Sequence, residues 1–442
     1  MNLLPAALCA LTLSLFATRA LAQDSPAPPV WSQSELEALA REVQGQIEEL
    51  RGERFRESVA VKVADRSTLV AYMKQRTEEM EPPEKLAADE RVAKLLGLIP
   101  PDMDLLATTY RLLEDQVAGF YDPPSKTFFL MDSMPKGIAG PILAHELVHA
   151  LDDQLYDLDA TMMELKDDSD ALQAFRFVVE GSGTAGGNRW TMEHMGEFDL
   201  SGFQELMDEQ QASLAAAPEW LWKPLLGAYL QGAAFLTRAK GILEGQTKAV
   251  SAEDIARAFR ERPRSTEQVL HPEKYWEPAL RDDPRTIRFE LGDLPDGWQH
   301  LREDTLGELG LALVAQRRDG ATALDFENPM SILSVRYTNE AAEGWDGDRL
   351  VLLGKEGESW LRLATVWDSE RDAGEFYGML QAVLPDLERA CQALAETAGP
   401  RARSGVALAY GERREEVVLT MWSGIARRDQ RQLEEAVSHS VE

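Results

Sequence analysis

Residues 144–154 read Ala144-His145-Glu146-Leu147-Val148-His149-Ala150-Leu151-Asp152-Asp153-Gln154 and decide the fold. Two histidines stand four positions apart, and on an α-helix that spacing turns by about 400°, so both imidazoles lie on one face about 6 Å apart along the axis. At that separation two ring nitrogens can bind one metal ion at about 2 Å each. The stretch therefore predicts a metal site on a helix.

Glu146 follows the first histidine directly and is rotated from it by about 100°, so it cannot easily become a third ligand. It can instead reach a metal-bound water molecule and take its proton. The competing interpretation is a buried structural helix whose histidines are merely hydrogen-bonded.

The residues around the motif favour the metal site. Gly140-Pro141 suits the first turn of a helix. A leucine then recurs every four residues on the side opposite the histidines, at Leu143, Leu147, Leu151 and Leu155. The predicted helix packs through this apolar stripe and presents His145 and His149 to another part of the chain.

Zinc in a catalytic site takes three protein ligands and keeps one position open for water. Glu180 lies 31 residues after His149, at the end of a predicted apolar helix face. A buried carboxylate without a partner is costly, and coordination to a metal would offset that cost. We therefore expect Glu180 to be the third ligand.

Four glycines follow Glu180, at Gly181, Gly183, Gly186 and Gly187. Each costs about 1 kcal/mol inside a helix. Either the helix ends at Glu180, or it continues because small residues let it approach the histidine helix closely. We favour the second interpretation.

Two β-prone runs, residues 117–121 and 127–131, flank the turn at Asp122-Pro123-Pro124-Ser125-Lys126 and predict a hairpin just before the histidine helix. One interpretation is that the hairpin only covers the core. Alternatively, one of its strands is an exposed edge above the metal, and an extended peptide pairs with it through main-chain hydrogen bonds.

The first residues predict export. Leu3 to Ala17 is mostly apolar and is followed by Ala20-Leu21-Ala22, a small-x-small cleavage pattern. We assign residues 1–22 to a signal peptide and 23–31 to a linker, which indicates a bacterial periplasm or exterior. A retained membrane anchor is the alternative, although the run is short for a span. The mature chain would hold one cysteine, Cys391, and no intramolecular disulfide.

The formal net charge of −30 argues against nucleic acid or an anionic membrane as a partner. Residues 224–243 are apolar, but Gln231, Arg238 and Lys240 interrupt them, which predicts a packed helix and no integral membrane span. Beyond about residue 285, strands and helices alternate without any cluster of ligand-like residues. We therefore expect an α+β protein with a mainly helical domain at 32–285 and a smaller α+β domain of unknown role at 286–442.

The motif His145-Glu146-Leu147-Val148-His149, with Glu180 in a Glu-Gly-x-x-Thr context, resembles the gluzincins, which are thermolysin-like zinc metallopeptidases. Residues 105–190 look closest to a poorly characterised family of secreted bacterial zincins, through Val117-Ala118-Gly119-Phe120-Tyr121-Asp122 and Asp153-Gln154. The resemblance implies a zincin-like fold with a small sheet, Zn²⁺ bound by His145, His149 and Glu180, and Glu146 as general base.

The chain departs from many gluzincins at one position. Where they carry an aspartate four residues after the ligand glutamate, which orients a histidine, this chain has Thr184. The partner of the histidines is therefore open, with Asp152, Asp153 and Asp170 as candidates.

Hydrolysis also needs a donor for the oxyanion besides the metal, usually His, Tyr or Arg. We single out His271 as a catalytic residue, with Tyr275 and His194 as alternatives and a backbone-bonded loop histidine as the plain interpretation. Two functions of different class remain. One is a secreted zinc peptidase acting on a peptide or protein, and the other is a zincin-fold binding or assembly factor with little hydrolysis. Substrate preference and oligomeric state cannot be read from the sequence.

Overall fold

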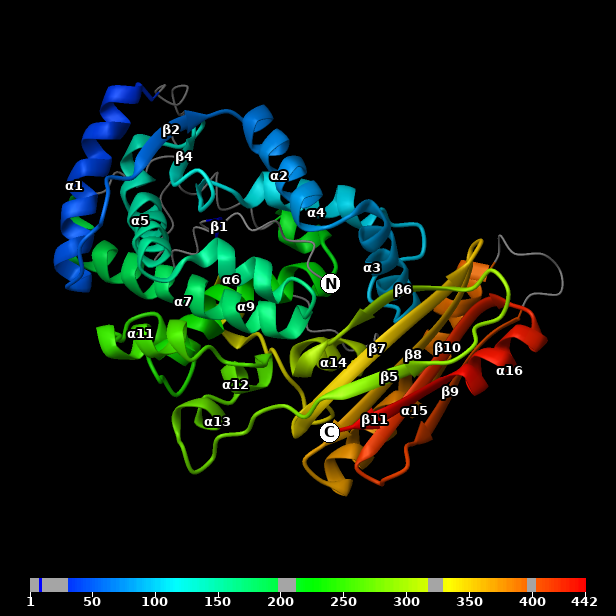
Figure 1. The fold of residues 1–442 in the computed structure, drawn as a ribbon. Helices are drawn as coiled ribbons and strands as arrows, with labels where there is room; N and C mark the ends of the chain where they lie inside the picture. Colours follow the sequence, from blue (N-terminus) through cyan, green and yellow to red (C-terminus); the bar gives the residue numbers. More distant parts are fainter. Residues whose placement is uncertain (1–7, 10–30, 198–211, 317–328, 396–402) are drawn as a thin grey trace.

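The computed structural model describes residues 8–9, 31–197, 212–316, 329–395 and 403–442 of an α+β protein. The predicted signal peptide and linker lie outside the described residues, apart from Leu8, Cys9 and Trp31. Figure 1 shows helices and a small sheet gathered in the first part of the chain, and a large sheet with its own helices in the last part. Among the described helices, none is both long enough and apolar enough to cross a membrane.

The first part of the chain is mainly helical. Its long helices are α1 (Gln33–Arg51), α2 (Arg66–Met80), α3 (Pro83–Leu95), α4 (Leu105–Gln116), α5 (Ala139–Tyr156), α6 (Leu158–Leu165), α7 (Ser169–Glu193) and α9 (Glu219–Leu236). Shorter ones follow at α10 (Ile242–Gly245), α11 (Ala252–Arg260), α12 (Thr266–Leu270) and α13 (Glu273–Trp276). The helix predicted from residues 224–243 is confirmed as the buried α9.

The small sheet has the strand order β1-β3-β4-β2. Its strands are β1 (Leu8–Cys9), β2 (Ala60–Ala64), β3 (Gly119–Asp122) and β4 (Thr127–Met131). β3 and β4 form the predicted hairpin, which is confirmed, and β2 pairs with β4 in parallel. The hairpin leads through a 3₁₀ turn (Lys136–Ile138) into α5, so the sheet lies beside the start of the histidine helix.

Helix α7 does not end at Glu180. It continues through all four glycines to Glu193, as the second interpretation predicted. A Cβ on Gly232 of α9 would overlap the carbonyl oxygen of Phe177, and one on Gly181 would overlap the backbone of Gly232. The backbones of α7 and α9 therefore touch directly, which only glycine allows at these positions.

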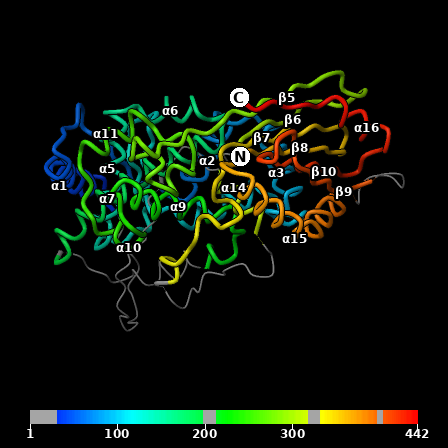
Figure 2. Tube along the Cα trace, turned by 90° about the horizontal axis from the view of Figure 1, so that it is seen from below, coloured from blue at the N-terminus to red at the C-terminus, as the bar shows by residue number. Residues whose placement is uncertain are grey.

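The last part of the chain is a layered sheet domain. The main sheet has the order β6-β7-β8-β10-β9, with β6 (Gln299–Asp304), β7 (Trp345–Lys355), β8 (Glu358–Trp367), β9 (Arg403–Tyr410) and β10 (Glu416–Ile425). Figure 2 shows α15 (Glu370–Ala395) on one face of this sheet and β5 (Ile287–Leu291) on the other. Helix α16 (Arg427–Ala436) contacts β10 and the C-terminal strand, whereas α14 (Gly307–Val314) contacts α7, α9 and α12 of the first part as well as β7. A 3₁₀ turn spans Pro329–Ser334.

The C-terminal strand β11 (Val437–Val441) pairs antiparallel with β5, from Val437 opposite Leu291 to Val441 opposite Ile287. This pairing joins the two ends of the predicted domain 286–442. Strand β7 runs through Asp346-Gly347-Asp348 with a bulge, and Gly347 lets the carbonyl of Arg285 approach closely.

Buried ion pairs cross the junction between the two parts. The guanidinium of Arg302 in β6 lies 2.6 Å from Asp89 of α3 and 2.5 Å from Asp304. Asp304 in turn accepts hydrogen bonds from the backbone and the hydroxyl of Ser169, the first residue of α7. The sheet domain is thereby attached to the start of α7.

Replacing Arg302 with leucine would leave Asp89 and Asp304 buried without their cation. Removing one partner of a buried ion pair costs about 3–5 kcal/mol, so we expect the free energy of unfolding in urea to fall by that amount. Arg66 pairs with Glu114 at the surface and is the matched control. Its leucine variant should lose less than about 1 kcal/mol. Equally small losses would contradict a stabilising role for the Arg302 pairs.

Candidate metal site

Helix α5 is buried along almost its whole length, from Ala139 to Gln154. Its leucine stripe is fully buried, at Leu143, Leu147 and Leu151. Because the helix is fixed by packing on that side, the turn-to-turn repeat carries His145 and His149 together onto the side that faces α7. The helix ends at Asp157, which takes a left-handed backbone conformation.

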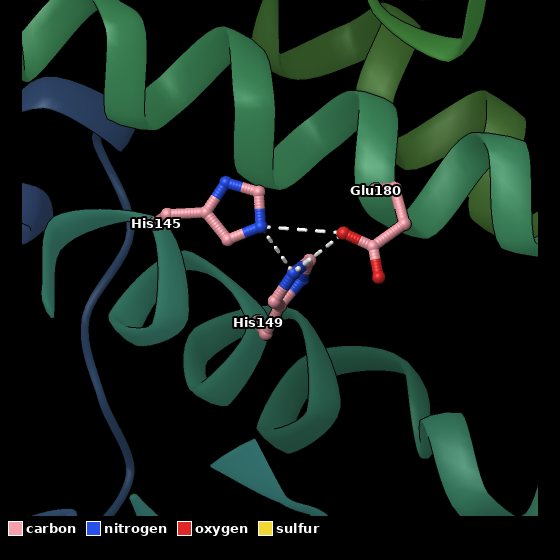
Figure 3. Close-up of side chains that lie close together, drawn as sticks. All are labelled: His145, His149 and Glu180. Carbon is pink, nitrogen blue, oxygen red and sulfur yellow. Dashed lines mark hydrogen bonds and ion pairs between the residues drawn. The ribbon is translucent and has the colours of Figure 1, made fainter. Parts of the chain in front are cut away.

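Three donor atoms converge between α5 and α7. Nε2 of His145 lies 3.2 Å from Oε2 of Glu180, and Nε2 of His149 lies 3.3 Å from the same oxygen. The two Nε2 atoms are 2.9 Å apart, and the imidazole planes meet at 87°. Figure 3 shows these three side chains pointing at one another from the two helices. The structure thus brings together the three residues that the sequence singled out as ligands.

Protonation states favour metal binding. Burial lowers the pKa of His145, and the neighbouring His149 lowers it further, so its imidazole is neutral and offers a lone pair. Burial acts to raise the pKa of Glu180, but interactions with His149 and His145 outweigh it and lower the pKa to about 2. Two imidazoles and a carboxylate, with one donor atom of each within 4.8 Å of the others, form a donor set that suits a divalent cation.

Glycines on α7 make room for the imidazoles. A Cβ on Gly183 would lie 2.5 Å from Cε1 of His149 and 2.8 Å from Cε1 of His145, and one on Gly187 would lie 3.2 Å from Cβ of His145. Any larger residue at Gly183 would therefore push α7 away or rotate the histidines. The close packing that these glycines allow offsets the low helix propensity of glycine, so the segment remains helical.

The variant Gly183→Ala should lose its bound metal, because the added methyl group occupies the space of the two imidazoles. We expect the metal content after dialysis, measured by mass spectrometry, to fall from about one ion per chain towards zero, although alanine favours the helix by about 1 kcal/mol.

Gly45 in α1 is the matched control, because a Cβ there meets nothing within 4 Å. Gly45→Ala should keep the full metal content. Full metal content in Gly183→Ala would show that metal binding does not need the space that Gly183 leaves for the two imidazoles.

Glu146 is fully buried and turned towards the small sheet. Its Oε2 accepts a hydrogen bond of 2.6 Å from the backbone N–H of Tyr121 in β3. The carboxylate therefore lies between the histidine helix and the β3 strand. Tyr121 is held by its own hydroxyl, which donates to Asp153 at 2.8 Å.

In the described chain the outer edge of β3 is covered, so an exposed edge stays a prediction for a chain without its leader. β3 is flanked on one side by β4 and on the other by β1, where Leu8 stands opposite Tyr121 and Cys9 opposite Phe120. The strand is buried throughout. Leu8 and Cys9 belong to the predicted signal peptide, and a chain cleaved after Ala22 would lack them.

None of the three candidate aspartates bonds an imidazole in the contacts that the structure describes. Asp152 pairs with the Arg51 guanidinium at 2.6 Å and accepts a hydrogen bond from the Ser182 hydroxyl at 2.6 Å. Asp153 accepts hydrogen bonds from Tyr121 and Lys126, and Asp170 accepts one from Thr266. These hydrogen bonds tie α5 to α1, α7 and the hairpin, so the aspartates hold the helices that carry the ligands.

Thr184 does not replace the missing aspartate. Its Oγ1 is buried and has no hydrogen-bond partner among the described residues, and the same holds for Nδ1 of His149.

His271, predicted to be catalytic, is engaged elsewhere. It lies at the end of α12, and its Nε2 is 2.9 Å from Oε1 of Glu308 in α14, which also accepts the Thr338 hydroxyl. Burial acts to lower the pKa of His271, but Glu308 raises it above the ordinary value. The described contacts do not bring His271 to the three donors, and its catalytic role stays a prediction without structural support. His194 instead stacks on Trp190.

A second group of acids, at Glu267, Asp282 and Asp368, has ligand-like spacing. Its centre is taken by the ammonium of Lys274, which lies 2.6 to 2.9 Å from all three carboxylates. This cluster is therefore an ion-pair network that already has its cation.

Sequence reasoning missed Tyr229 of α9. Its ring stacks on His145 with centroids 5.6 Å apart and planes 20° apart. No local pattern distinguishes a tyrosine of the core from one that contacts His145. Arg51 was missed for a similar reason, because its partners lie 101 and 131 positions away in the chain.

Comparison with known proteins bears on the last part of the chain. Residues 296–430 match a family described as a domain of unknown function (DUF8575). The matched segment lies within the predicted C-terminal domain and covers β6 to β10, α15 and part of α16, but none of the three donor residues. Neither the curated proteins nor the solved structures contain a match to this chain.

Proposed function

We propose that the protein is an exported zinc-dependent peptidase of gluzincin type, with His145, His149 and Glu180 as the metal ligands. The observation that carries this proposal is the convergence of two imidazoles and one carboxylate at a glycine-lined contact of two helices. Zinc prefers nitrogen and oxygen donors and uses three protein ligands when it is catalytic. Zinc bound here would activate a water molecule for attack on a carbonyl.

Residues of the chain would carry out the proton transfers of the reaction. Glu146 follows a ligand on the same helix, and its carboxylate is placed to accept the proton of the attacking water and pass it to the leaving amine. The backbone N–H of Tyr121 holds that carboxylate in place at 2.6 Å. Burial of the site excludes bulk water, which strengthens each of these electrostatic interactions.

The β3 strand would bind the substrate. Its outer edge pairs with two residues of the chain itself, in antiparallel register. An extended peptide can use the same main-chain hydrogen bonds once the leader is removed. Because Tyr121 of this strand contacts Glu146, a peptide on this edge would run beside the general base.

A binding or assembly factor built on the same fold is the second candidate. It would keep the metal for stability and would not hydrolyse peptides. The two candidates differ in what Glu146 does, because a purely structural metal site has no use for a general base.

The variant Glu146→Gln separates the two candidates. Its amide oxygen can still accept the Tyr121 N–H, so we expect unchanged zinc content, while cleavage of unfolded casein should fall by about 10²–10⁴-fold. Glu57→Gln, in the loop before β2, is the control and should cleave like wild type. If Glu146→Gln cleaves as fast as wild type, the peptidase proposal is wrong.

Metal removal should lower stability. Zinc that binds only the folded chain stabilises it by about 4 kcal/mol at a free concentration of about 1,000 times the dissociation constant. We therefore expect chelation to lower the melting temperature in calorimetry and added zinc to restore it. In Glu180→Gln the shift should be much smaller. An equal shift in both proteins would indicate that zinc binds elsewhere.

A further inference from the structure

Helix α9 adds a third wall to the metal site. Tyr229 is buried, and its ring lies nearly parallel to the imidazole of His145, with the centroids 5.6 Å apart. Offset stacked rings with centroids about 4.5–7 Å apart attract one another. His149 meets the same imidazole at 87°. The His145 ring is therefore confined by one aromatic face and one neighbouring imidazole.

The position of Tyr229 is set by the direct contact of α9 with α7. Gly232 stands three residues after Tyr229, on the same side of α9, and a Cβ added to it would overlap the backbone at Phe177 and come within 3.1 Å of the backbone nitrogen of Gly181. Gly181 directly follows the ligand Glu180. The tyrosine ring and the ligand carboxylate are thus fixed to the same pair of closely packed backbones.

Ligand histidines are usually oriented by a carboxylate that accepts the second ring N–H. In the part of the chain that the structure describes, Asp152, Asp153 and Asp170 are bonded to other groups, and Thr184 leaves its hydroxyl unpaired.

We propose that Tyr229 is a positioning residue, whose ring fixes the plane of the His145 imidazole and so directs Nε2 towards the metal. Rotation of the imidazole out of its plane would drive ring atoms into the tyrosine face. Stacking thereby does the orienting work that a carboxylate does in related sites. This inference rests on the proposed metal site and extends it, because it assigns the orienting group.

The test compares Tyr229→Leu with Tyr229→Phe in the full chain, using Zn²⁺ and a competing chromophoric chelator. Loss of an orienting partner typically weakens metal affinity by about 10–100-fold, and we expect this loss for Tyr229→Leu. Tyr229→Phe keeps the aromatic face and should stay within about threefold of wild type. The d–d absorption of bound Co²⁺ should change in the leucine variant and remain as in wild type in the phenylalanine variant.

Phe235→Leu is the matched control, because Phe235 is another buried ring of α9 that packs on Tyr275 and Trp276. It should lower the melting temperature of the metal-free protein and leave zinc affinity unchanged. Wild-type affinity in Tyr229→Leu would overturn the proposal. Equal losses in Tyr229→Leu and Tyr229→Phe would overturn it as well, because the hydroxyl would then be the active group.

The outcome also distinguishes this inference from the proposed function. If the wild-type protein binds zinc but cleaves no peptide, the proposed peptidase function is wrong. The zinc affinities of the Tyr229 variants then still decide whether Tyr229 positions His145. A wild-type protein that binds no zinc would overturn both.

Discussion

The site depends on how closely α7 approaches α5. Donor atoms on two helices come within about 3 Å only if the facing surface of one helix carries almost no side chain, and Gly183 and Gly187 supply that surface. The same helix meets α9 through Gly181 on another side. The glycines of α7 lower its helix propensity but allow close contact with α5 and α9. The packing between these helices must therefore outweigh the loss in helix propensity.

Buried polar groups then tie this arrangement to the rest of the chain. Arg51 of α1 reaches both Asp152 of α5 and Ser182 of α7, so one guanidinium joins three helices next to the donors. At the other end of α7, Asp304 of β6 bonds Ser169. The sheet domain is therefore attached to the helix that carries Glu180, although it contributes none of the three donors. A disturbance at the junction would be transmitted along α7, because a helix moves as a rigid rod over a few turns.

The local part of this architecture could be predicted from the sequence, and the non-local part could not. The spacing of His145 and His149 fixes a common helix face, and the turn residues at 122–126 fix a hairpin, because both depend on near neighbours in the chain. Glu180 needed an assumption about the cost of a buried carboxylate. His271 shows where that reasoning ends, since its partner Glu308 lies 37 positions away and no local pattern identifies it. Tyr229 was missed for the same reason. Composition also does not reveal the bulge of β7 near Gly347, because aspartate and glycine are equally typical of turns.

The position of Glu146 is the strongest structural argument for hydrolysis over simple metal storage. Two histidines and Glu180 are enough to bind a cation, and a structural site gains nothing from a further buried acid beside them. Burying a carboxylate costs free energy that must be offset by other contacts. Here the acid stands on the ligand helix and is bonded to the backbone of the strand that would hold a peptide. In the proposed peptidase this acid would be the general base, and glutamine would satisfy Tyr121 equally well if hydrogen bonding were its sole purpose.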